Sequence, residues 1–453
     1  MKRVMRSVLL AACLCLVVLT ASGCGNIGFT LDPQALYSLP KLPPKYDALN
    51  TLLAEIENGG AEYAAPASGT NIQAVQMVDL DGDGQEEAVA FFRNASDEKP
   101  LKIYIFAAKD DTYQQEAVIE GSGTGIYSIA YNDMDQDGQT ELLVGWKVSA
   151  DMQAISVYSL RDGEPQELLR TNYVKYAALN LDQDERQELV VLRADTEGDG
   201  IAEYYDWQNG SLLLQSSARI SITMAELSQQ GRVKSGMLQE SVPALFITGV
   251  VESRSITDIL AVKNGELVNV VLSSVTGVSS EISDFRSLYP TDINSDGVTE
   301  VPSPVPLPLW EYGEENPYRR IDWYSYDMDG QATKVLSTYH NSEDGWYLQL
   351  PAEWEDRISV MHSTSSNESS VSFCIREAGQ EEPQEFLRIT TLTGTGRESR
   401  AVRGNRFNLI RQSDTIYVAE LMEANNTWAY GVTEDEVRAA FSLIRQEWLA
   451  GDN

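Results

Sequence analysis

The chain has 453 residues, of which 34 are Lys or Arg and 68 are Asp or Glu, so its formal net charge at neutral pH is −34. This balance argues against partners that are themselves polyanions, such as nucleic acid and anionic lipid surfaces. Only two histidines occur, His340 and His362, which leaves little material for zinc chemistry or a Ser-His-Asp triad. We expect both histidines to be surface or loop residues.

The first 23 residues have the composition of a secretory signal peptide. A basic start, "MKRVMRS", precedes a 12-residue apolar run, "VLLAACLCLVVL", which is too short to span a bilayer. The segment "ASGC", ending at Cys24, resembles a bacterial lipobox, and this resemblance implies cleavage before Cys24, acylation of its sulfur and a membrane anchor on the extracytoplasmic face. The alternative is an ordinary signal peptide with an incidental cysteine. Cys374 would then be the lone internal thiol, expected as a small buried hydrophobe.

A tether and a helix follow the signal. Residues 24–44 contain four prolines and are interpreted as a semi-rigid spacer between membrane and body. In residues 45–60, "KYDALNTLLAEIENGG", Leu49, Leu52, Leu53 and Ile56 recur at helical spacing before two glycines. We expect a short helix whose apolar face packs on the body that follows.

An acidic motif then recurs four times. The segments "DLDGDGQEE", "DMDQDGQTE", "NLDQDERQE" and "DINSDGVTE" begin at residues 79, 133, 180 and 292. Each lies between two apolar runs rich in strand-forming residues, which places the acids on a tight connection between strands. An EF-hand needs an acid at the twelfth position, but here Ala90, Val144, Val191 and Ser303 occupy it.

These segments resemble the calcium loops of FG-GAP and VCBS repeats in integrin-type β-propellers. In that family the residues at positions one, three, five and nine, with the carbonyl at seven, hold one Ca²⁺ ion. The resemblance implies four sets of ligands: Asp79, Asp81, Asp83 and Glu87; Asp133, Asp135, Asp137 and Glu141; Asn180, Asp182, Asp184 and Glu188; Asp292, Asn294, Asp296 and Glu300. The sharp turn at position six suits Gly84, Gly138 and Gly297, whereas Glu185 in the third loop would need an unfavourable positive φ.

The spacing indicates a further, altered unit. The last two motifs are 112 residues apart, about twice the other separations of 54 and 47, and residues 238–272 hold two apolar runs without an acidic loop. A repeat of about fifty residues built from short strands is typical of a propeller blade. We therefore predict a mainly β fold, a propeller of about five blades in residues 45–342. A second acidic segment, residues 195–203, is interpreted as a solvated hairpin turn.

Residues 343–453 are predicted to form a small α+β domain. About five strand-like runs precede "TEDEVRAAFSLIRQEWL", in which Thr433 and Glu436 form a capping box and Val437, Ala440, Phe441 and Ile444 an apolar stripe. We expect one helix there, docked across a sheet.

The functional prediction is a non-catalytic binding or scaffold module at the bacterial cell membrane. Calcium would stiffen its loops, and the partner would be a protein or a cell-wall polysaccharide, with the protein itself a monomer. The alternative is a glycoside hydrolase, because that chemistry needs only two carboxylates. The aromatic runs Tyr204, Tyr205, Trp207 and Trp323, Tyr324, Tyr326 could stack on sugars, but their equivalent places in two repeats favour packing.

Overall fold

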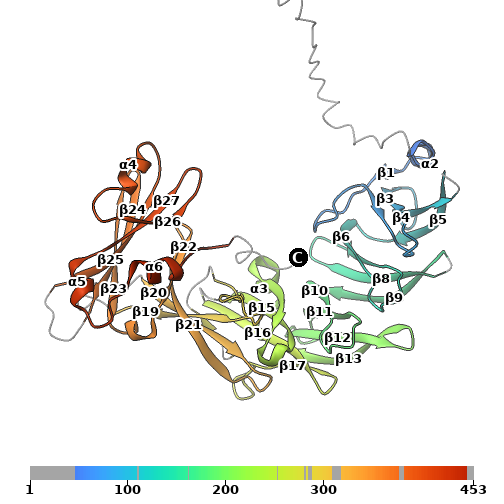
Figure 1. Cartoon of the computed structure of the whole chain (residues 1–453). Coiled ribbons are helices and arrows are strands. Elements are labelled where there is room, and N and C mark those ends of the chain that lie inside the picture. The colour runs from blue at the N-terminus through green and yellow to red at the C-terminus, as the bar shows by residue number, and fades with distance from the viewer. Residues whose placement is uncertain are drawn as a thin grey trace, which may run out of the picture.

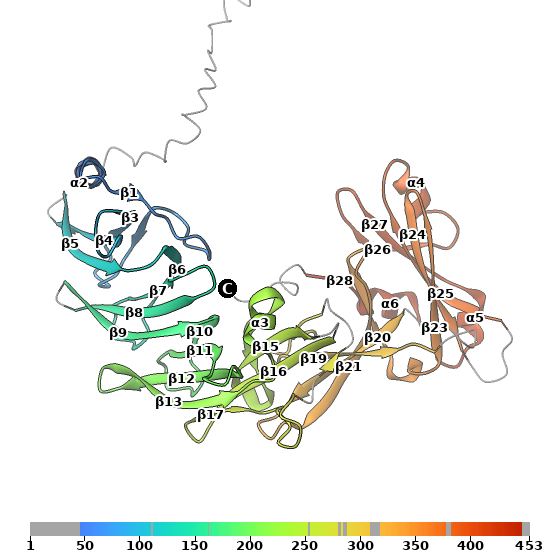
Figure 2. The ribbon, with the colours of Figure 1, turned by 180° about the vertical axis from the view of Figure 1, so that it is seen from behind.

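The computed structural model describes residues 46–109, 112–161, 163–251, 254–279, 282–283, 288–308, 318–376 and 382–445. Over these ranges the strands form six antiparallel sheets, which follow one another along the chain in an open arc (Figure 1). The reverse view shows the same arc, with β1 to β5 at one end and the last sheet at the other (Figure 2). The predicted signal peptide, Cys24 and the spacer at 24–44 lie outside the described residues.

The first three sheets share one plan, in which the chain moves outward strand by strand. In the figures β6 and β10 lie on the inner side of the arc, and β5, β9 and β13 on the outer side. The strands of the first sheet are β1 (Glu62–Tyr63), β2 (Val75–Val78), β3 (Glu87–Arg93), β4 (Leu101–Lys109) and β5 (Thr112–Gly121). Those of the second are β6 (Gly125–Asn132), β7 (Glu141–Lys147), β8 (Gln153–Arg161) and β9 (Glu164–Tyr173), and those of the third β10 (Lys175–Leu179), β11 (Glu188–Ala194), β12 (Gly200–Gln208) and β13 (Ser211–Arg219).

The strand that follows the acidic loop in each of these sheets, β3, β7 or β11, is buried on both faces. In β7, Leu142 and Val144 pack in a core shared with the first sheet, whereas Leu143 enters a core shared with the third. Successive side chains of a strand point to opposite faces, so a strand between two neighbouring sheets must be apolar at every position. The continuous runs "EAVAFF", "ELLVGW" and "ELVVL" are therefore explained by face-to-face packing of consecutive sheets.

The predicted altered unit forms the fourth sheet. It contains β14 (Arg232–Met237), β15 (Pro243–Val251), β16 (Arg254–Lys263), β17 (Glu266–Asn269) and β18 (Ile282–Ser283), preceded by α3 (Met224–Gln230). The connection from β14 to β15 is the short 3₁₀ turn Gln239–Ser241. The period of the sequence thus located a sheet whose acidic loop is absent.

A bulge recurs in four sheets, in the strand pairs β4–β5, β8–β9, β12–β13 and β20–β21. It lies at Ile105/Phe106, Val157/Tyr158, Tyr204/Tyr205 and Trp323/Tyr324. The register of β16 with β17 in the fourth sheet is regular. The four sheets that carry acidic loops therefore share a second irregularity, which strengthens the evidence for a structural repeat.

The helix predicted near residue 45 is confirmed as α2 (Asp47–Asn58). Leu49 and Leu53 are buried in a cluster with Ala88, Phe92 and Phe106 of the first sheet. The helix ends before Gly60, whose φ of +94° reverses the chain. Among the described residues, no helix combines the length and apolar composition needed to cross a bilayer.

The chain after residue 300 builds two further sheets. The fifth contains β19 (Val301–Pro306), β20 (Arg319–Tyr326), β21 (Ala332–Asn341), β22 (Trp346–Leu350) and β28 (Phe441–Leu443), and the sixth β23 (Ile358–Ser365), β24 (Glu368–Ile375), β25 (Gln384–Leu392), β26 (Phe407–Arg411) and β27 (Ile416–Leu421). Short helices lie around the sixth sheet: η3 (Ala352–Trp354), α4 (Arg397–Ala401), α5 (Glu423–Thr427) and α6 (Glu434–Ala440). Residue 343, where the domain boundary was predicted, falls in the turn of the β21–β22 hairpin.

The final helix is shorter than the sequence predicted. The capping box of Thr433 and Glu436 is present, but α6 ends at Ala440 and the next three residues form β28, paired with β22. Phe441 enters the core against Trp346 and Tyr417. Pairing with an open strand edge and burial of this ring outweigh the helical pattern that the spacing indicates.

Candidate metal centres

The four acidic loops occupy equivalent places in the fold. In the first three sheets the loop leads from the inner strand to the second strand, whose first residue is the ninth-position glutamate: Glu87, Glu141 or Glu188. The fourth loop leads from Thr291 to β19, and Glu300 forms an isolated bridge with Thr291. All four glutamates are buried, with exposures between 0 and 4%. The sequence therefore predicted correctly that the acids lie on strand connections.

The backbone of each loop turns at two left-handed residues. Position six is Gly84, Gly138, Glu185 or Gly297, with φ of +84°, +89°, +79° and +90° respectively. The positive φ expected at Glu185 is thus confirmed. Position four is also left-handed, at Gly82, Gln136, Gln183 and Ser295. Two such turns curl nine residues so tightly that alternate side chains face the same interior.

The first acid of the loop holds this turn closed. The backbone N–H of Gly84 donates to Asp79 at 3.0 Å, that of Gly138 to Asp133 at 3.1 Å, and that of Gly297 to Asp292 at 2.9 Å. In the third loop the first residue bonds position four and not position six: Asn180 accepts from the backbone N–H of Gln183 at 2.7 Å. The fifth-position acids accept from position seven, as Asp137 does from Gln139 at 2.8 Å.

The ninth-position glutamate uses only one of its oxygens within the protein. Its Oε2 accepts the backbone N–H of position two, from Leu80 at 2.8 Å, Met134 at 2.9 Å, Leu181 at 2.6 Å and Ile293 at 3.1 Å. The Oε1 atoms of Glu141, Glu188 and Glu300 are buried without a hydrogen-bond partner, as are Oδ1 of Asp133 and Oδ1 of Asp135. Because a buried oxygen without a partner is costly, these atoms indicate a group that is missing from the protein alone.

The pKa values of the four glutamates indicate that the missing group carries a positive charge. Burial, together with the charges of neighbouring Asp side chains, raises the pKa of Glu87, Glu141, Glu188 and Glu300 to about 7. Hydrogen bonds from the loop backbone oppose this rise but do not cancel it. A cation in the loop would restore the charged form, because an opposite charge at close range favours ionisation.

Three loops bring three carboxylates within reach of one ion. The oxygens of Asp79, Asp81 and Glu87 lie within 4.8 Å of one another, and the same holds for Asp133, Asp135 and Glu141, and for Asp182, Asp184 and Glu188. In the fourth loop the amide of Asn294 replaces a carboxylate and donates to Asp296 at 2.8 Å. The atoms that could coordinate a metal are all oxygens, which suits a hard divalent cation.

The third loop departs from the others. The guanidinium of Arg186 bonds Asp184 through Nε at 3.0 Å and holds the pKa of that carboxyl below its usual range. The first ligand is the neutral Asn180, already bonded to Gln183. The second loop also has a cation beside its acids, because Nη2 of Arg161 lies 3.3 Å from Oδ2 of Asp135, so the third loop differs mainly in its neutral first residue.

The loops are also bonded to one another. The backbone N–H of Thr140 in the second loop donates to the carbonyl of Leu80 in the first at 2.8 Å, and Gln187 in the third donates to Met134 in the second at 2.8 Å. Thr299 in the fourth makes the same bond to Met237 of the fourth sheet at 2.8 Å. Each bond joins position eight of one unit to the preceding unit, so the bonds connect the first three loops and, separately, the fourth loop to the fourth sheet.

Other predicted features fall into structural roles. The acidic segment 195–203 lies at the hairpin between β11 and β12, where Asp195 caps the turn by accepting from Glu197 and Asp199. Tyr204, Tyr205, Trp207, Trp323 and Tyr326 are buried, which confirms packing over sugar stacking for these five. Cys374 is buried as expected, and burial raises the pKa of its thiol to about 12.

The prediction for His340 was wrong. His340 lies in β21 between the rings of Trp323 and Tyr347, and both of its ring nitrogens are buried without partners. Burial lowers its pKa to about 4, so it is neutral at physiological pH. Side chains alternate between the two faces of a sheet, and the ring of this residue lies on the face that carries the rings of Trp323 and Tyr347. His362 is exposed on β23, with a 2.6 Å hydrogen bond to the hydroxyl of Tyr339.

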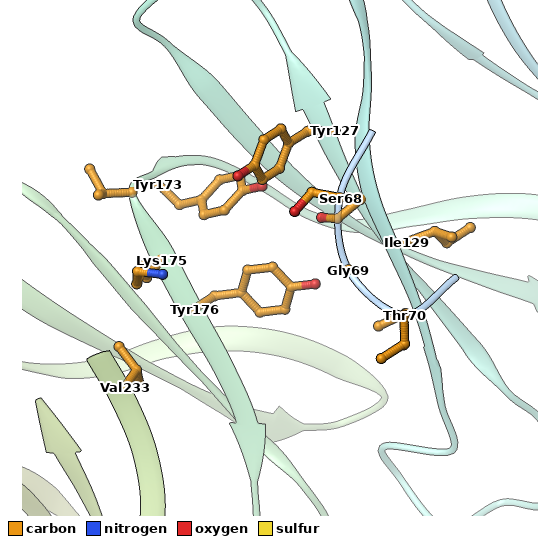
Figure 3. Close-up of a pocket in the computed structure, with 12 residues that line it drawn as sticks. Ser68, Gly69, Thr70, Tyr127, Ile129, Tyr173, Lys175, Tyr176 and Val233 are labelled. Carbon is orange, nitrogen blue, oxygen red and sulfur yellow. The ribbon is translucent and has the colours of Figure 1, made fainter. Parts of the chain in front are cut away.

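The sequence did not reveal a pocket on the inner side of the arc. It has a volume of about 120 Å³ and is lined by the start of β10, by β6 and by the segment before β2 (Figure 3). Its most distinctive residues are Tyr127, Tyr173, Lys175 and Tyr176. These residues come from different units, and no regular spacing along the sequence connects them. The one sequence feature that could have indicated the pocket is Lys175, a charged residue within the apolar run "YVKYAAL".

Comparison with known proteins gives only distant likenesses. No protein-family model matches the chain, and no curated protein matches it. Among solved structures, rhamnogalacturonan lyase YesW is similar with a TM-score of 0.30 at 13% identity, over 79% of this chain and 74% of that one. A protein from Lactobacillus plantarum is similar with a TM-score of 0.26 at 9% identity, over 71% of this chain and 86% of that one. Neither is close enough to transfer a property to this chain.

Proposed function

We propose that the protein is a lipid-anchored, extracytoplasmic bacterial lipoprotein whose β-propeller, of about five FG-GAP or VCBS-type blades, is stabilised by Ca²⁺ and acts as a non-catalytic binding or scaffold module. The observation that carries the metal is the set of buried, unpartnered carboxylate oxygens at equivalent positions of successive loops. The partner is a protein or a cell-wall glycan, and the protein acts as a monomer.

Calcium is the metal that best suits the loops. Carboxylate, amide and carbonyl oxygens on a short flexible loop are typical of Ca²⁺, whereas Mg²⁺ demands a more regular octahedron and retains water. The ninth-position oxygen without a partner, the first, third and fifth side chains and the carbonyl at position seven would hold the ion. When bound, the ion would supply positive charge beside buried carboxylate oxygens that have no hydrogen-bond partner within the protein.

The role that we assign to calcium is to stiffen the row of sheets. Because the first and second loops each accept a backbone bond from the next loop, fixing one of the first three loops restrains its neighbour. The close approach of the first two loops supports this, since a Cβ atom at Gly82 would lie 2.3 Å from the carbonyl oxygen of Gly138. A stiff arc presents its inner surface to a partner in a fixed form, which lowers the entropic cost of binding.

A non-catalytic role is favoured by the environment of the buried acids. Outside the four loops, the buried acids of the described chain are Glu203, Asp258 and Asp322. Glu203 is paired with Arg193, Asp258 accepts from Ser221 and Asn269, and Asp322 is paired with Arg320 and Lys334. Glycoside hydrolysis requires two acids with free access to a substrate, and these three are engaged.

Thermal unfolding of the full-length chain in detergent tests the proposal. The melting temperature is measured with Ca²⁺, with Mg²⁺ and with excess EDTA. A ligand that binds only the folded state raises stability by about 2.7 kcal/mol per site at a hundredfold excess over its dissociation constant. We expect a large rise in Ca²⁺ and a much smaller one in Mg²⁺. Equal melting in Ca²⁺ and EDTA would reduce the loops to solvated turns and refute the metal.

Lipid attachment and location are tested separately. Labelling of cells with a fatty-acid analogue should mark the wild-type chain and leave Cys24→Ala unmarked, and the variant should be released from the membrane fraction. Labelling of both would place the lipid elsewhere, and labelling of neither would leave an ordinary signal peptide as the explanation of "ASGC".

A further inference from the structure

The pocket on the inner side of the arc lies away from the acidic loops. It is lined by Tyr127 and Ser128 in the first half of β6, and by Lys175 and Tyr176 at the start of β10, whereas the loops follow the far ends of these strands. A second cavity of about 220 Å³ continues along the same strands toward the loops, and Tyr176 lines both. The inner surface therefore has a metal-loop end and a tyrosine end.

Three tyrosines from two sheets shape the tyrosine end. Figure 3 shows the rings of Tyr127, Tyr173 and Tyr176 gathered around the pocket, with Ser68 and Thr70 of the segment before β2 on another side. The rings of Tyr173 and Tyr176 meet edge to face, with centroids 5.4 Å apart. Such a wall offers flat apolar faces together with hydroxyl groups, and this combination suits a ligand that is itself a ring with hydroxyl groups.

Two cations stand beside these tyrosines without acids. Lys175 lines the pocket and makes no ion pair or hydrogen bond with any described residue. Arg232 begins the neighbouring strand β14; its Nε is buried without a hydrogen-bond partner, and its guanidinium lies over the ring of Tyr289. Burial and the charge of Arg232 both lower the pKa of Lys175.

The chain as a whole has a net charge of −34, but no ion pair joins Lys175 or Arg232 to an acid among the described residues. Some basic residues do pair with acids, as Lys102 does with Asp97 and Glu120, and as Arg320 does with Asp322 and Asp356. Two neighbouring positive groups that lack a counterion repel one another, so an anion brought between them gains energy from both. The surrounding acidic surface would repel the same anion everywhere else.

We propose that this pocket binds an acidic sugar, with the ring against the tyrosines and its carboxylate or phosphate group on Lys175 and near Arg232. The inference rests on the proposed binding function and names the ligand class for it. With a volume of about 120 Å³, the pocket takes one unit of a saccharide whose remainder lies outside.

The test is calorimetric titration of the full-length chain in detergent and Ca²⁺. Digalacturonate supplies the carboxylate, its neutral counterpart galactobiose lacks it, and glucose 1-phosphate supplies a phosphate. We expect at least one acidic ligand to bind roughly tenfold or more tightly than galactobiose, because a charge-assisted hydrogen bond is lost with the acid group. The two acidic ligands distinguish the two sources of the charge.

Variants connect this binding to the pocket. Lys175→Gln should weaken the acidic ligand roughly tenfold or more and leave galactobiose unchanged, and Lys175→Arg should retain most of the affinity. Lys234→Gln is the matched control, because Lys234 lies two residues beyond Arg232 and its ammonium bonds the carbonyl of Pro290 outside the pocket lining. Its affinity should stay within about twofold of wild type.

The outcomes separate this inference from the proposed function. Equal binding of acidic and neutral sugars, an unchanged affinity in Lys175→Gln, or no saccharide binding at millimolar concentration would overturn the inference. The Ca²⁺ shift in melting temperature is measured on the same samples. If that shift persists while acidic sugars do not bind, the metal-stabilised module stands and only its ligand class is wrong. If acidic sugars bind but Ca²⁺ does not shift the melting temperature, the ligand class stands and the metal stabilisation is wrong. A normal shift in Lys175→Gln also shows that the variant is folded.

Discussion

The second and fourth sheets make the same connection, from inner strand to second strand, with different chemistry. From β6 to β7 the chain passes through Asp133 to Glu141 and leaves three buried carboxylate oxygens without partners. From β14 to β15 it needs only Gln239–Ser241, closed by a backbone bond from Leu238 to Val242 of 2.8 Å. The fold thus does not need an acidic loop to turn here. The acids are costly additions to the protein alone, and in three loops they form clusters that could hold a metal ion.

The largest expected effect comes from removing two metal loops at once. Asp81→Ala combined with Asp135→Ala should lower the melting temperature in Ca²⁺, by about 2.7 kcal/mol of stability per lost site at a hundredfold excess of the ion. In EDTA the double variant should melt close to wild type, because without metal Asp81 makes a weak, exposed hydrogen bond with the backbone N–H of Asp83, and Asp135 a weak, partly exposed ion pair with Arg161. Thermal scans in both media check this. Equal losses in the two media would show that the acids stabilise the fold by themselves.

A single isosteric change should act in opposite directions in the two media. In Glu141→Gln the amide oxygen still accepts from Met134, but the buried charge disappears. We expect a higher melting temperature than wild type in EDTA at pH 8, because a buried charge without a partner is unfavourable, and a lower one in Ca²⁺. Glu240→Gln, at the exposed turn of the fourth sheet, is the matched control and should change neither. A loss in both media would mean that Glu141 supports the loop without metal.

The pH dependence follows from the raised pKa of the four glutamates. The unfolded chain loses their protons near 4.5, whereas the folded chain without metal keeps them up to about 7. Between these values the folded state binds more protons, so its stability in EDTA should fall as pH rises. The gain from Ca²⁺ should grow over the same range, because the ion needs deprotonated ligands. Urea unfolding at pH 5, 6, 7 and 8 checks both, and a flat profile in EDTA would contradict the buried charges.

The smallest effect concerns the third loop. Glu185→Gly should raise stability by up to about 1 kcal/mol in both Ca²⁺ and EDTA, because a left-handed residue with a side chain is strained by roughly that amount. The reverse change in the second loop, Gly138→Glu, should destabilise by a similar amount. Chemical unfolding of the two variants measures the difference. No gain from Glu185→Gly would mean that the contacts of Glu185 compensate for its backbone.

The sequence predicted those features that repeat. Spacing alone located the loops, the strands around them and the fourth sheet, because a tight metal-type turn restricts which residues can stand at positions one to nine. It also indicated that Tyr204 and Trp323 pack, since both occupy one place in two units. The recurrent bulges had no signature, because a bulge depends on how two strands pair and not on one strand's composition.

The features that the sequence missed depend on contacts between distant segments. Phe441 leaves the helical pattern because β22 offers an open edge nearly a hundred residues earlier. His340 is buried by the rings of Trp323 and Tyr347 from neighbouring strands. The tyrosine end of the inner surface combines Ser68, Tyr127 and Lys175 from three units. No local spacing contains this information, since only the arc brings these segments together.

The bonds between position eight of one unit and the preceding unit have a consequence for how such a protein changes in evolution. These bonds use backbone N–H and carbonyl groups, so each of them can form whatever side chain stands at position eight. Thr299 makes its bond to Met237 although the fourth sheet has lost its acids. Duplication or deletion of a whole unit would therefore join two surfaces that already fit. Within one unit, side chains can diverge while these bonds keep the sheets in register, except at close approaches such as Gly82.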